Sequence, residues 1–434
     1  MIKKKILIDT RNLSLLDGTG IATYARNLAY IIKDLNYEVG LLLDRKKNFQ
    51  KNEKLNEINF YDEKHYNTYF KYFKNLKAFL PYFNSKYFNL NKDKVINTDY
   101  FRNFYPFYNF LTNSNNIIEI SRIKFSLYKQ LINLIPNNKI DDCIDIYHST
   151  SPLPLLLKGK INICTIHDII PLEYPYFTDD DKKNYYQLIQ KILKNYNHII
   201  SVSDATKKTL IKFFNIEEKK ITTTYQSVHI PENIKSLDIK SENFLLFLDK
   251  FTLKPKNYFI VYGTIERRKN ILKIINSFLS IQDKNLKLVI IGKLGHHADK
   301  ELETFSDLNN NQLNLRKILF FNYLKRDILL NLIKGSKAII NASFAEGFGL
   351  QLLEGMNLGV PVIASNITAH QEIGGDAVLY VDPASDEQIT KAMINIIDNE
   401  QLANQLVDKG YKQSKLFTKE IVQSKVASVY SQFI

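Results

Sequence analysis

The stretch from residue 338 to residue 354, AIINASFAEGFGLQLLE, contains a predicted strand, a loop with two glycines and the start of a helix. Its apolar start predicts a buried strand, and the apolar spacing that follows predicts a helix that begins between Phe348 and Leu350. Gly347 and Gly349 allow backbone N–H groups at the positive end of this helix to approach an anion closely. A strand, a loop of this kind and a helix, in this order, are typical of a parallel α/β sheet.

The same alternation of strands and helices continues on both sides of this stretch. It predicts an α/β protein of two successive doubly wound domains, at 1–240 and 241–415, followed by a C-terminal helix at 416–434. The polar, lysine-rich residues 232–256 are interpreted as the linker between the domains. The expected strands lie at 6–8, 39–43, 145–149, 161–166, 198–202, 221–226, 258–262, 286–291, 317–321, 338–341, 360–364 and 378–381.

Length and composition limit the classes of function. The 434 residues are enough for two or three domains, and 45% hydrophobic residues favour a large core over disorder. The formal net charge of +14 favours anionic partners such as nucleic acid, anionic lipid or phosphate-bearing substrates. We expect no signal peptide and no membrane span, because the apolar runs are too short. Cys143 and Cys164 lie in apolar runs, which argues against disulfides and a cysteine zinc site and fits a reducing cytosol.

Residues 71–140 differ from the rest of the chain in composition. They hold 16 of the 53 aromatic residues and 11 Lys or Arg against 3 Asp or Glu, and glycine is missing. We expect helical pieces here, within an insertion at about 45–140 in the N-terminal domain. Aromatic and basic side chains suit an anionic membrane surface, but they are equally compatible with the core of additional helices.

A second candidate for anion binding is the stretch 263–270, GTIERRKN. Gly263 ends a predicted strand, and Arg267, Arg268 and Lys269 precede a predicted helix. Cations at a helix N-terminus oppose the helix dipole, so an anionic ligand explains them better than folding does. Arginine can bind a phosphate with two parallel hydrogen bonds, and lysine acts as a point charge. The alternative is a solvated run of charge.

Glu346 and Glu354 are separated by eight positions, one before the predicted helix and one within it. Two carboxylates placed in this way can bind two different hydroxyl groups of a long ligand. The alternative is a glutamate that caps the helix and a second one that is solvated on the surface. The residues alone leave both interpretations open.

Weaker signals lie in the N-terminal part. Gly18-Thr19-Gly20 follows the first strand but lacks the full spacing of a dinucleotide-binding loop. His167-Asp168 ends a strand, where a histidine can hydrogen-bond a substrate hydroxyl, act as an acid or base, or only cap the loop. We expect no metal site, because Thr178 is predicted to cap a helix whose first turn attracts Asp179–Asp181, and His296-His297 has no diagnostic spacing.

Taken together, these motifs resemble the family-4 retaining glycosyltransferases, which use nucleotide-sugar donors. The resemblance rests on the loop at 18–24, on His167-Asp168 and above all on 263–270 and 346–354. It covers roughly 1–45 and 140–430 of the chain. It implies the GT-B fold, in which two Rossmann-like domains face each other across a cleft and the last helix crosses back to the N-terminal domain.

The resemblance also implies roles for individual residues. Arg268 and Lys269 would bind the donor diphosphate and stabilise the charge of the leaving group. Glu346 would hold sugar hydroxyls, Glu354 the ribose, and His167 would contact the transferred sugar.

The remaining donor contacts implied by the resemblance come mostly from backbone groups of glycine-containing loops. The full donor-binding set is Gly18, Gly20, Gly263, Arg268, Lys269, Gly347, Phe348, Gly349, Leu350 and Glu354. Two features depart from the family pattern: Gln351, where many relatives carry proline, and the short loop at 18–20, where longer glycine-rich loops are common.

The implied reaction is transfer of a sugar, with GDP-mannose as the first expectation for the donor, without a metal or other cofactor. The acceptor would be a glycan or a polyprenyl-linked glycan in O-antigen or capsule synthesis. Such an enzyme is expected in the cytoplasm, and at the inner membrane face if residues 71–140 bind anionic lipid. The alternatives are rhamnosyl or glucosyl transfer, an epimerase or phosphorylase of the same fold, and a nucleic-acid-binding protein, for which no motif is found.

Overall fold

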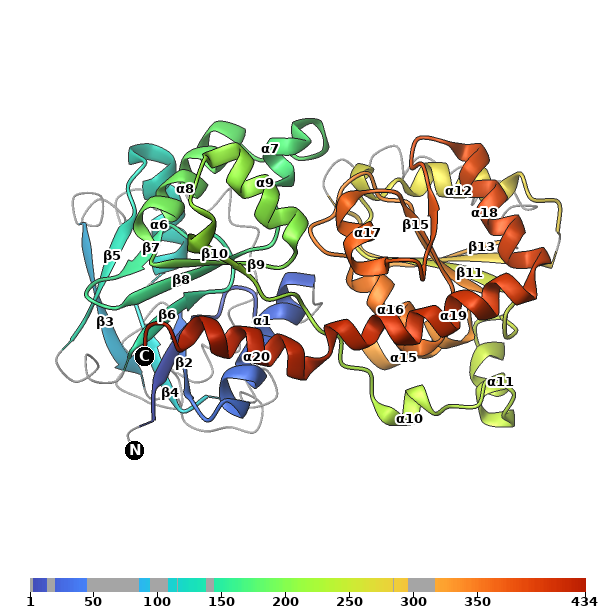
Figure 1. The fold of residues 1–434 in the computed structure, drawn as a ribbon, viewed down its shortest axis with the longest axis horizontal. Coiled ribbons are helices and arrows are strands. Elements are labelled where there is room, and N and C mark those ends of the chain that lie inside the picture. The colour runs from blue at the N-terminus through green and yellow to red at the C-terminus, as the bar shows by residue number, and fades with distance from the viewer. Residues whose placement is uncertain are drawn as a thin grey trace, which may run out of the picture.

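The computed structural model of the chain describes residues 3–13, 20–44, 86–93, 108–114, 116–137, 144–283, 285–295 and 317–434. In this part of the chain the strands form two sheets, which belong to two domains that lie side by side (Figure 1). Helices cover both faces of each sheet. The predicted α/β fold class, with two doubly wound domains, is therefore confirmed.

The C-terminal sheet is parallel throughout, with the strand order β13-β12-β11-β14-β15-β16. From β11 the chain continues outward to β12 and β13 on one side of the sheet, and from β14 it continues outward to β15 and β16 on the other side. The strand order therefore reverses between β11 and β14. This is the switch point at which open α/β sheets form a crevice outside the carboxyl ends of the strands. The strands are β11 (Tyr258–Tyr262), β12 (Lys287–Ile291), β13 (Ile318–Phe321), β14 (Ala338–Asn341), β15 (Val362–Ser365) and β16 (Leu379–Val381).

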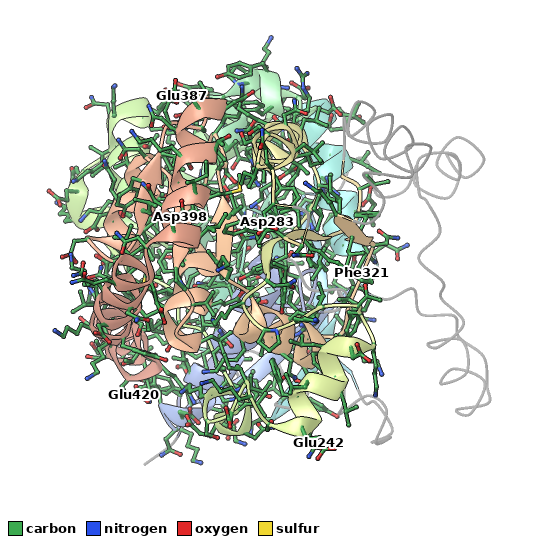
Figure 2. All side chains as sticks on the ribbon, turned by 90° about the vertical axis from the view of Figure 1, so that its right-hand side faces the viewer. Glu242, Asp283, Phe321, Glu387, Asp398 and Glu420 are labelled. Carbon is green, nitrogen blue, oxygen red and sulfur yellow. The ribbon has the colours of Figure 1, made fainter. Side chains whose placement is uncertain are left out.

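Alternation of buried side chains places helices on both faces of this sheet. Phe259 and Val261 face one apolar layer, and Ile260 faces the other. Helices α12 (Ile271–Leu279) and α18 (Asp386–Asp398) pack on the first face, whereas α15 (Arg326–Gly335) and α16 (Leu350–Leu358) pack on the second. Figure 2 views this domain end-on and shows α18 on the outside, with Glu387 and Asp398 labelled. Short helix α17 (Thr368–Gly374) and long helix α19 (Glu400–Ser414) complete this domain.

The N-terminal sheet has the order β10-β9-β8-β6-β1-β2-β4-β3-β5-β7 within the described residues. Its pairs are parallel except β3 with β4, and its switch point lies between β1 and β6. The strands are β1 (Lys5–Asp9), β2 (Glu38–Leu43), β3 (Tyr87–Asp93), β4 (Phe110–Asn113), β5 (Ile132–Pro136), β6 (Ile146–Ser149), β7 (Leu155–Leu157), β8 (Ile161–Ile166), β9 (His198–Ser201) and β10 (Ile221–Thr223). The helices and turns are α1 (Gly20–Asp34), α6 (Ile117–Tyr128), α7 (Ile170–Glu173), η3 (Pro175–Phe177), α8 (Lys182–Asn195), α9 (Asp204–Phe214) and η4 (Glu218–Lys220).

Two expectations from composition need correction. The described parts of 71–140 contain three strands and one helix, α6, rather than helical pieces alone, and these strands extend the N-terminal sheet. Residues 45–85 and 94–107 lie outside the described residues. The interpreted linker, 232–256, contains helices α10 (Glu232–Lys235) and α11 (Glu242–Asp249). Phe244 and Leu248 of α11 are buried in the core, so this segment is partly folded against the C-terminal domain.

Side-chain caps fix the first residues of α8 and α9. Ser203 is the N-cap of α9 and accepts a hydrogen bond from the Thr206 N–H. The predicted cap at Thr178 is wrong, because α8 begins at Lys182 and the Asp181 carboxylate accepts from the Asn184 N–H. A 3₁₀ turn occupies 175–177, which moves the start of α8 along the chain.

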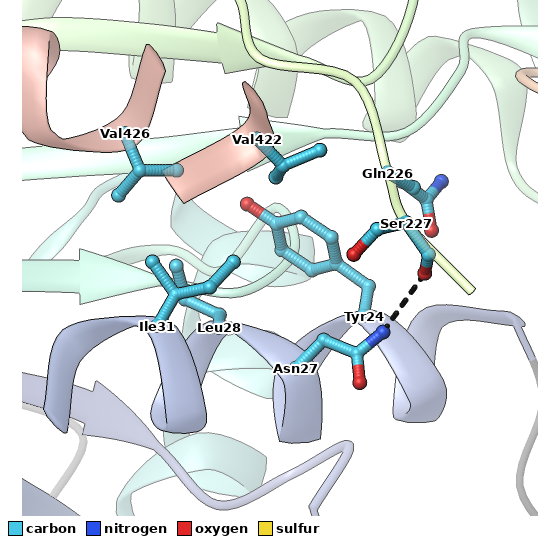
Figure 3. Close-up of a pocket in the computed structure, with 8 residues that line it drawn as sticks. All are labelled: Tyr24, Asn27, Leu28, Ile31, Gln226, Ser227, Val422 and Val426. Atoms are coloured by element: carbon cyan, nitrogen blue, oxygen red, sulfur yellow. Dashed lines mark hydrogen bonds between the residues drawn. The ribbon is translucent and has the colours of Figure 1, made fainter. Parts of the chain in front are cut away.

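The last helix returns to the N-terminal domain, as predicted. The 3₁₀ turn η6 (Lys415–Phe417) links α19 to α20 (Lys419–Tyr430), which lies beside α1 (Figure 1). Val422 and Val426 of α20 face Tyr24 of α1 across a small pocket, and the Asn27 side chain donates a hydrogen bond of 3.0 Å to the Ser227 carbonyl (Figure 3). None of the predicted site residues lines this pocket.

A buried polar chain ties α20 to the N-terminal sheet. The Tyr430 hydroxyl lies 2.6 Å from Nδ1 of His148, whose Nε2 lies 2.8 Å from the Thr165 hydroxyl. That hydroxyl lies 2.7 Å from the Tyr24 hydroxyl on α1. The side chains of His148 and Tyr430 are fully buried, so each needs its partner inside the protein.

We predict that Tyr430→Phe destabilises the protein by about 1–3 kcal/mol, because it leaves a buried nitrogen of His148 without a partner. Urea unfolding followed by circular dichroism measures the effect. Tyr186→Phe is the control, because Tyr186 is partly exposed and its stacking on Phe214 survives the change. Equal midpoints for the Tyr430→Phe variant and the parent would contradict the role of this chain.

Candidate active site

The loops after β11 and β14 meet at the C-terminal switch point. The first contains Gly263 and the 3₁₀ turn η5 (Arg267–Lys269), and the second ends at Gly349 and the start of α16. Gly263 has a φ of 120° and Gly349 a φ of 114°, backbone conformations that favour glycine. The Phe344 N–H donates to the Arg268 carbonyl over 2.9 Å, which joins the two loops directly.

Glu346 lies between two cations. Its Oε1 is 2.5 Å from Nζ of Lys269, and its Oε2 is 2.8 Å from Nη1 of Arg268. Arg268 also pairs with Glu266 through Nη2 at 2.5 Å and donates to the Ala345 carbonyl. The Arg268 and Lys269 side chains are each 15% exposed and that of Glu346 12%, so a solvated run of charge is ruled out for these two cations. Arg267 is exposed.

The charges of this cluster hold one another ionised. Burial opposes the charge of Glu346, but Arg268 and Lys269 outweigh it and hold the pKa of this carboxyl well below its usual range. Burial likewise opposes the charge of Arg268, but Glu346 and Glu266 raise its pKa. Burial raises the pKa of Asp168, and the nearby Arg268 only partly offsets it. The cluster therefore offers fixed cations and a fixed carboxylate at neutral pH.

Glu354 is also buried and paired, which rules out a solvated glutamate. Its Oε1 is 2.5 Å from Nη2 of Arg326, and its Oε2 accepts a hydrogen bond from the Tyr262 hydroxyl. Sequence reasoning missed Arg326 and Tyr262. For Arg326 the signal was available: it is the first residue of α15, where a cation opposes the helix dipole, and the same argument had singled out 267–269.

The second loop contacts the N-terminal domain at the carboxyl end of β8. A Cβ atom at Gly347 would lie 2.2 Å from the His167 carbonyl oxygen, so only glycine fits. The Ser203 hydroxyl donates to the Gly347 carbonyl over 2.6 Å. Gly20 lies beside Leu350: a Cβ atom at Gly20 would lie 3.4 Å from a Leu350 methyl group, an ordinary van der Waals contact. The structure thus brings His167 and Gly20 next to the loop that follows β14.

His167 is held in one neutral form. Its Nε2 lies 2.9 Å from the Thr150 carbonyl, which can only accept, so Nε2 carries the proton and Nδ1 is an acceptor. Burial lowers the pKa of His167 to about 4. Thr150 is fixed in turn by the buried Asp9, which accepts from its N–H at 2.6 Å and from its hydroxyl at 2.9 Å. Among the described residues Nδ1 has no hydrogen-bond partner, so it can accept one from a substrate hydroxyl.

Two further side chains lie near the second loop: His370, which sequence reasoning missed, and Gln351, which it named only as a departure from the family pattern. His370 is fully buried, contacts Gly349 and has no hydrogen-bond partner on Nε2 among the described residues. Its Nδ1 lies 3.1 Å from the Ser365 carbonyl, which again makes Nε2 an acceptor. Gln351, the departure from the family pattern, donates its side-chain amide to the Tyr262 carbonyl. Gln351 thus ties the start of α16 to the end of β11, which a proline could not do.

Some residues named from the sequence lie outside the described residues. Gly18, Cys143 and His296-His297 are outside them. Within the described ranges no group of three or more His, Cys, Asp or Glu is placed to hold a metal ion. In the same ranges no helix is long and apolar enough to cross a membrane.

Comparisons with known proteins indicate the class of enzyme. The family model Glycosyltransferase Family 4 matches residues 115–230, and the model Glycosyl transferases group 1 matches residues 247–413. The O-antigen chain mannosyltransferase B of Escherichia coli is 27% identical over 291 residues, 66% of this chain and 74% of that protein. The O-antigen chain mannosyltransferase RfbU of Salmonella typhimurium is 27% identical over 245 residues, 56% of this chain and 62% of that protein.

A structural comparison supports the same fold. The crystal structure of Anabaena Alr3699/HepE in complex with UDP matches with a TM-score of 0.65 at 12% identity, and the match covers 99% of this chain and 100% of that one. The chain is a glycosyltransferase with the GT-B fold. The match to the first family model starts at 115, so in this glycosyltransferase the family likeness begins within 45–140, earlier than the motifs indicated.

We predict that Lys269→Ala and Glu346→Gln each lower the release of nucleoside diphosphate from the donor by about 10²- to 10³-fold, because each removes a charged group of the cluster. The thermal midpoint should change little in the lysine variant, since Glu346 keeps its pair with Arg268. Lys273→Ala is the matched control, because Lys273 pairs with Asp386 on the surface of the same domain. Full activity in either cluster variant would refute the assignment.

The buried histidines predict loss of stability in acid. Burial lowers the pKa to about 3 for His148 and to about 4 for His167 and His370. Below pH 6.5 the unfolded chain binds protons that the native protein does not, so the free energy of unfolding falls between about pH 6.5 and 4. Each histidine contributes about 1.4 kcal/mol per pH unit at most.

Burial raises the pKa of three carboxyl groups, those of Asp9, Asp168 and Glu372. At low pH the native protein binds protons at these groups more readily than the unfolded chain does, which partly offsets the loss of stability caused by the histidines. A difference measurement separates the two effects. His148→Gln should flatten the dependence of the unfolding free energy on pH between 6.5 and 5, and the exposed His229→Gln is the control. An unchanged slope in His148→Gln would show that His148 does not stay neutral in the native protein.

Proposed function

We propose that this glycosyltransferase transfers a hexose from a nucleoside diphosphate donor to a glycan or polyprenyl-linked glycan during synthesis of a cell-surface polysaccharide. The observation that carries the proposal is the buried cluster of Arg268, Lys269 and Glu346 at the switch point. GDP-mannose is the first candidate for the donor, since the relatives named above are O-antigen mannosyltransferases. The reaction would occur in the cytoplasm, at the inner membrane face if the acceptor is lipid-linked.

The cluster contains the hydrogen-bond donors and positive charge that stabilise a departing diphosphate. The Lys269 ammonium has three N–H bonds and uses one on Glu346, so others are available for phosphate oxygens. Backbone N–H groups at 347–350 add the positive end of α16. Fixed cations and dipoles stabilise the charge that develops on the leaving group without reorganisation, and this is the largest contribution in many enzymes. Gly18 and Gly20 would close on the phosphates from the N-terminal domain.

The remaining residues would orient the two halves of the donor. Glu346 would accept hydrogen bonds from hydroxyls of the sugar, and Glu354 would exchange part of its pairing for hydroxyls of the ribose. His167, neutral with a free Nδ1, would accept from a hydroxyl of the transferred sugar. We further propose that the configuration at the anomeric carbon is retained, with the acceptor attacking on the face from which the diphosphate leaves and a phosphate oxygen taking its proton. No protein nucleophile is needed for this route.

A UDP-sugar donor is the second candidate. The comparison structure named above contains UDP, and a further structure of the same protein contains UDP-glucose. Glucosyl or rhamnosyl transfer and an epimerase reaction on the same fold are thus the alternatives closest in chemistry. Nucleic-acid binding has only the charge of the chain in its favour.

A panel of nucleotides tests the proposal. In a thermal-shift assay, GDP should raise the melting temperature more than UDP, dTDP or CMP at equal concentration, since binding to the native state alone stabilises it. GDP-mannose should then release GDP slowly in water, with EDTA present, because no metal is expected to be required. Nuclear magnetic resonance of the first product should show the α-anomer. A preference for UDP would replace the donor, and no response to any nucleotide would refute the proposal.

A further inference from the structure

Three aromatic side chains gather on the segment that follows His167-Asp168. They belong to the end of α7 and to the 3₁₀ turn η3: Tyr174, Tyr176 and Phe177. The ring centroids of Tyr176 and Phe177 are 4.5 Å apart, and that of Tyr174 is 6.4 Å from Tyr176 and 6.3 Å from Phe177. Tyr176 is 65% exposed, so core packing does not account for it.

A fourth ring joins this group from the other domain. Phe344 stacks on Phe177 with a centroid distance of 5.3 Å and an angle of 26° between the rings. Phe344 lies two positions before Glu346 and donates its N–H to the Arg268 carbonyl. The four rings, which we call the aromatic platform, therefore come from both domains and lie next to the charged cluster of the candidate active site.

The nearest charged residues on either side of the platform in the sequence are acidic. Glu173 precedes the 3₁₀ turn and Asp179, Asp180 and Asp181 follow it, all of them exposed. Two lysines come next, and the Lys182 ammonium donates to the Thr178 carbonyl. Four carboxylates against these two ammonium groups leave the segment net negative, so it disfavours phosphate groups and anionic lipid. Carboxylates accept hydrogen bonds from hydroxyl groups. An exposed ring face in such a segment suits a neutral pyranose, whose C–H bonds lie on one face and whose hydroxyls point outward.

We propose that Tyr176 and Phe177, continued by Phe344, bind a sugar ring of the acceptor beside the donor site. The proposal rests on the proposed function and extends it, because it places a neutral sugar of the acceptor at the end of β8. The first sugar of the acceptor would then lie next to Glu346 and Lys269. Residues 71–140 are not required for this contact.

The composition of the chain allows a direct measurement of binding. The protein contains no tryptophan, so Tyr176→Trp introduces a single indole that reports only from the platform. The variant is titrated with methyl glycosides of mannose, glucose, galactose, N-acetylglucosamine and rhamnose. We expect a saturable change of the tryptophan emission with at least one of them. No saturable change with any of the five overturns the proposal.

A kinetic measurement adds a second readout. The glycoside that binds is used as the acceptor with the donor that the nucleotide panel identifies. Tyr176→Ala should raise the KM for this acceptor about 3- to 10-fold, the value of one aromatic contact, and leave the hydrolysis of the donor in water unchanged. Tyr128→Ala is the matched control, since Tyr128 on α6 is also exposed and lies in the same domain. An unchanged KM in Tyr176→Ala overturns the proposal.

The two measurements separate failure of the platform from failure of the proposed function. Donor hydrolysis without a response to sugars leaves the glycosyl transfer intact and refutes the platform. A saturable response to a sugar without hydrolysis of any donor refutes the proposed function and supports the platform. A change of emission with vesicles of anionic lipid, but with no glycoside, would assign the exposed rings to a membrane instead and overturn the proposal.

Discussion

The pairing of Glu346 with Arg268 and Lys269 is the interaction on which the candidate active site depends. The cations precede α12 and the carboxylate precedes α16, so the two loops come from neighbouring strands of one sheet. A buried charge without a partner costs several kcal/mol, which means that neither loop could keep its position alone. Their pairing fixes Phe344 beside Arg268 and brings Gly347 against His167. The arrangement of the candidate active site is thus decided by three side chains at one switch point.

The two domains are joined by contacts of different physical character. The C-terminal helix buries Val422, Val426 and Tyr430 on α1 and the N-terminal sheet, and apolar burial of this kind is costly to reverse. Between α17 and α9 the contact is polar: the Glu372 carboxylate accepts from the N–H groups of Asp204 and Ala205 at 2.7 and 2.8 Å. Polar groups of this kind exchange with water at small net cost. Separation of the domains on this side would therefore cost less at Glu372 than at α20.

Strands could be predicted with correct bounds where a run of apolar residues ends at a clear sequence boundary. The strands at 258–262 and 338–341 have the predicted bounds, because each is an apolar run that ends at a glycine or a polar residue. The cap at Thr178 was wrong, and in 71–140 helix α6 is accompanied by three strands that were not predicted. In the first case a 3₁₀ turn that no periodicity reveals shifts the helix, and in the second the short strands of a sheet edge have no clear period.

The sequence by itself determined that the chain has two parallel α/β domains and that Glu346, Glu354 and the cations at 268–269 are site candidates, because glycines, strand ends and charges at helix starts are local features. It left open whether each charge is solvated or paired. Only the tertiary structure decided that Glu346 binds both cations and that Glu354 binds Arg326 and Tyr262. The aromatic platform likewise appears only in the fold, because Phe177 and Phe344 are far apart in the chain. Strand order sets which loops become neighbours, and no local pattern contains it.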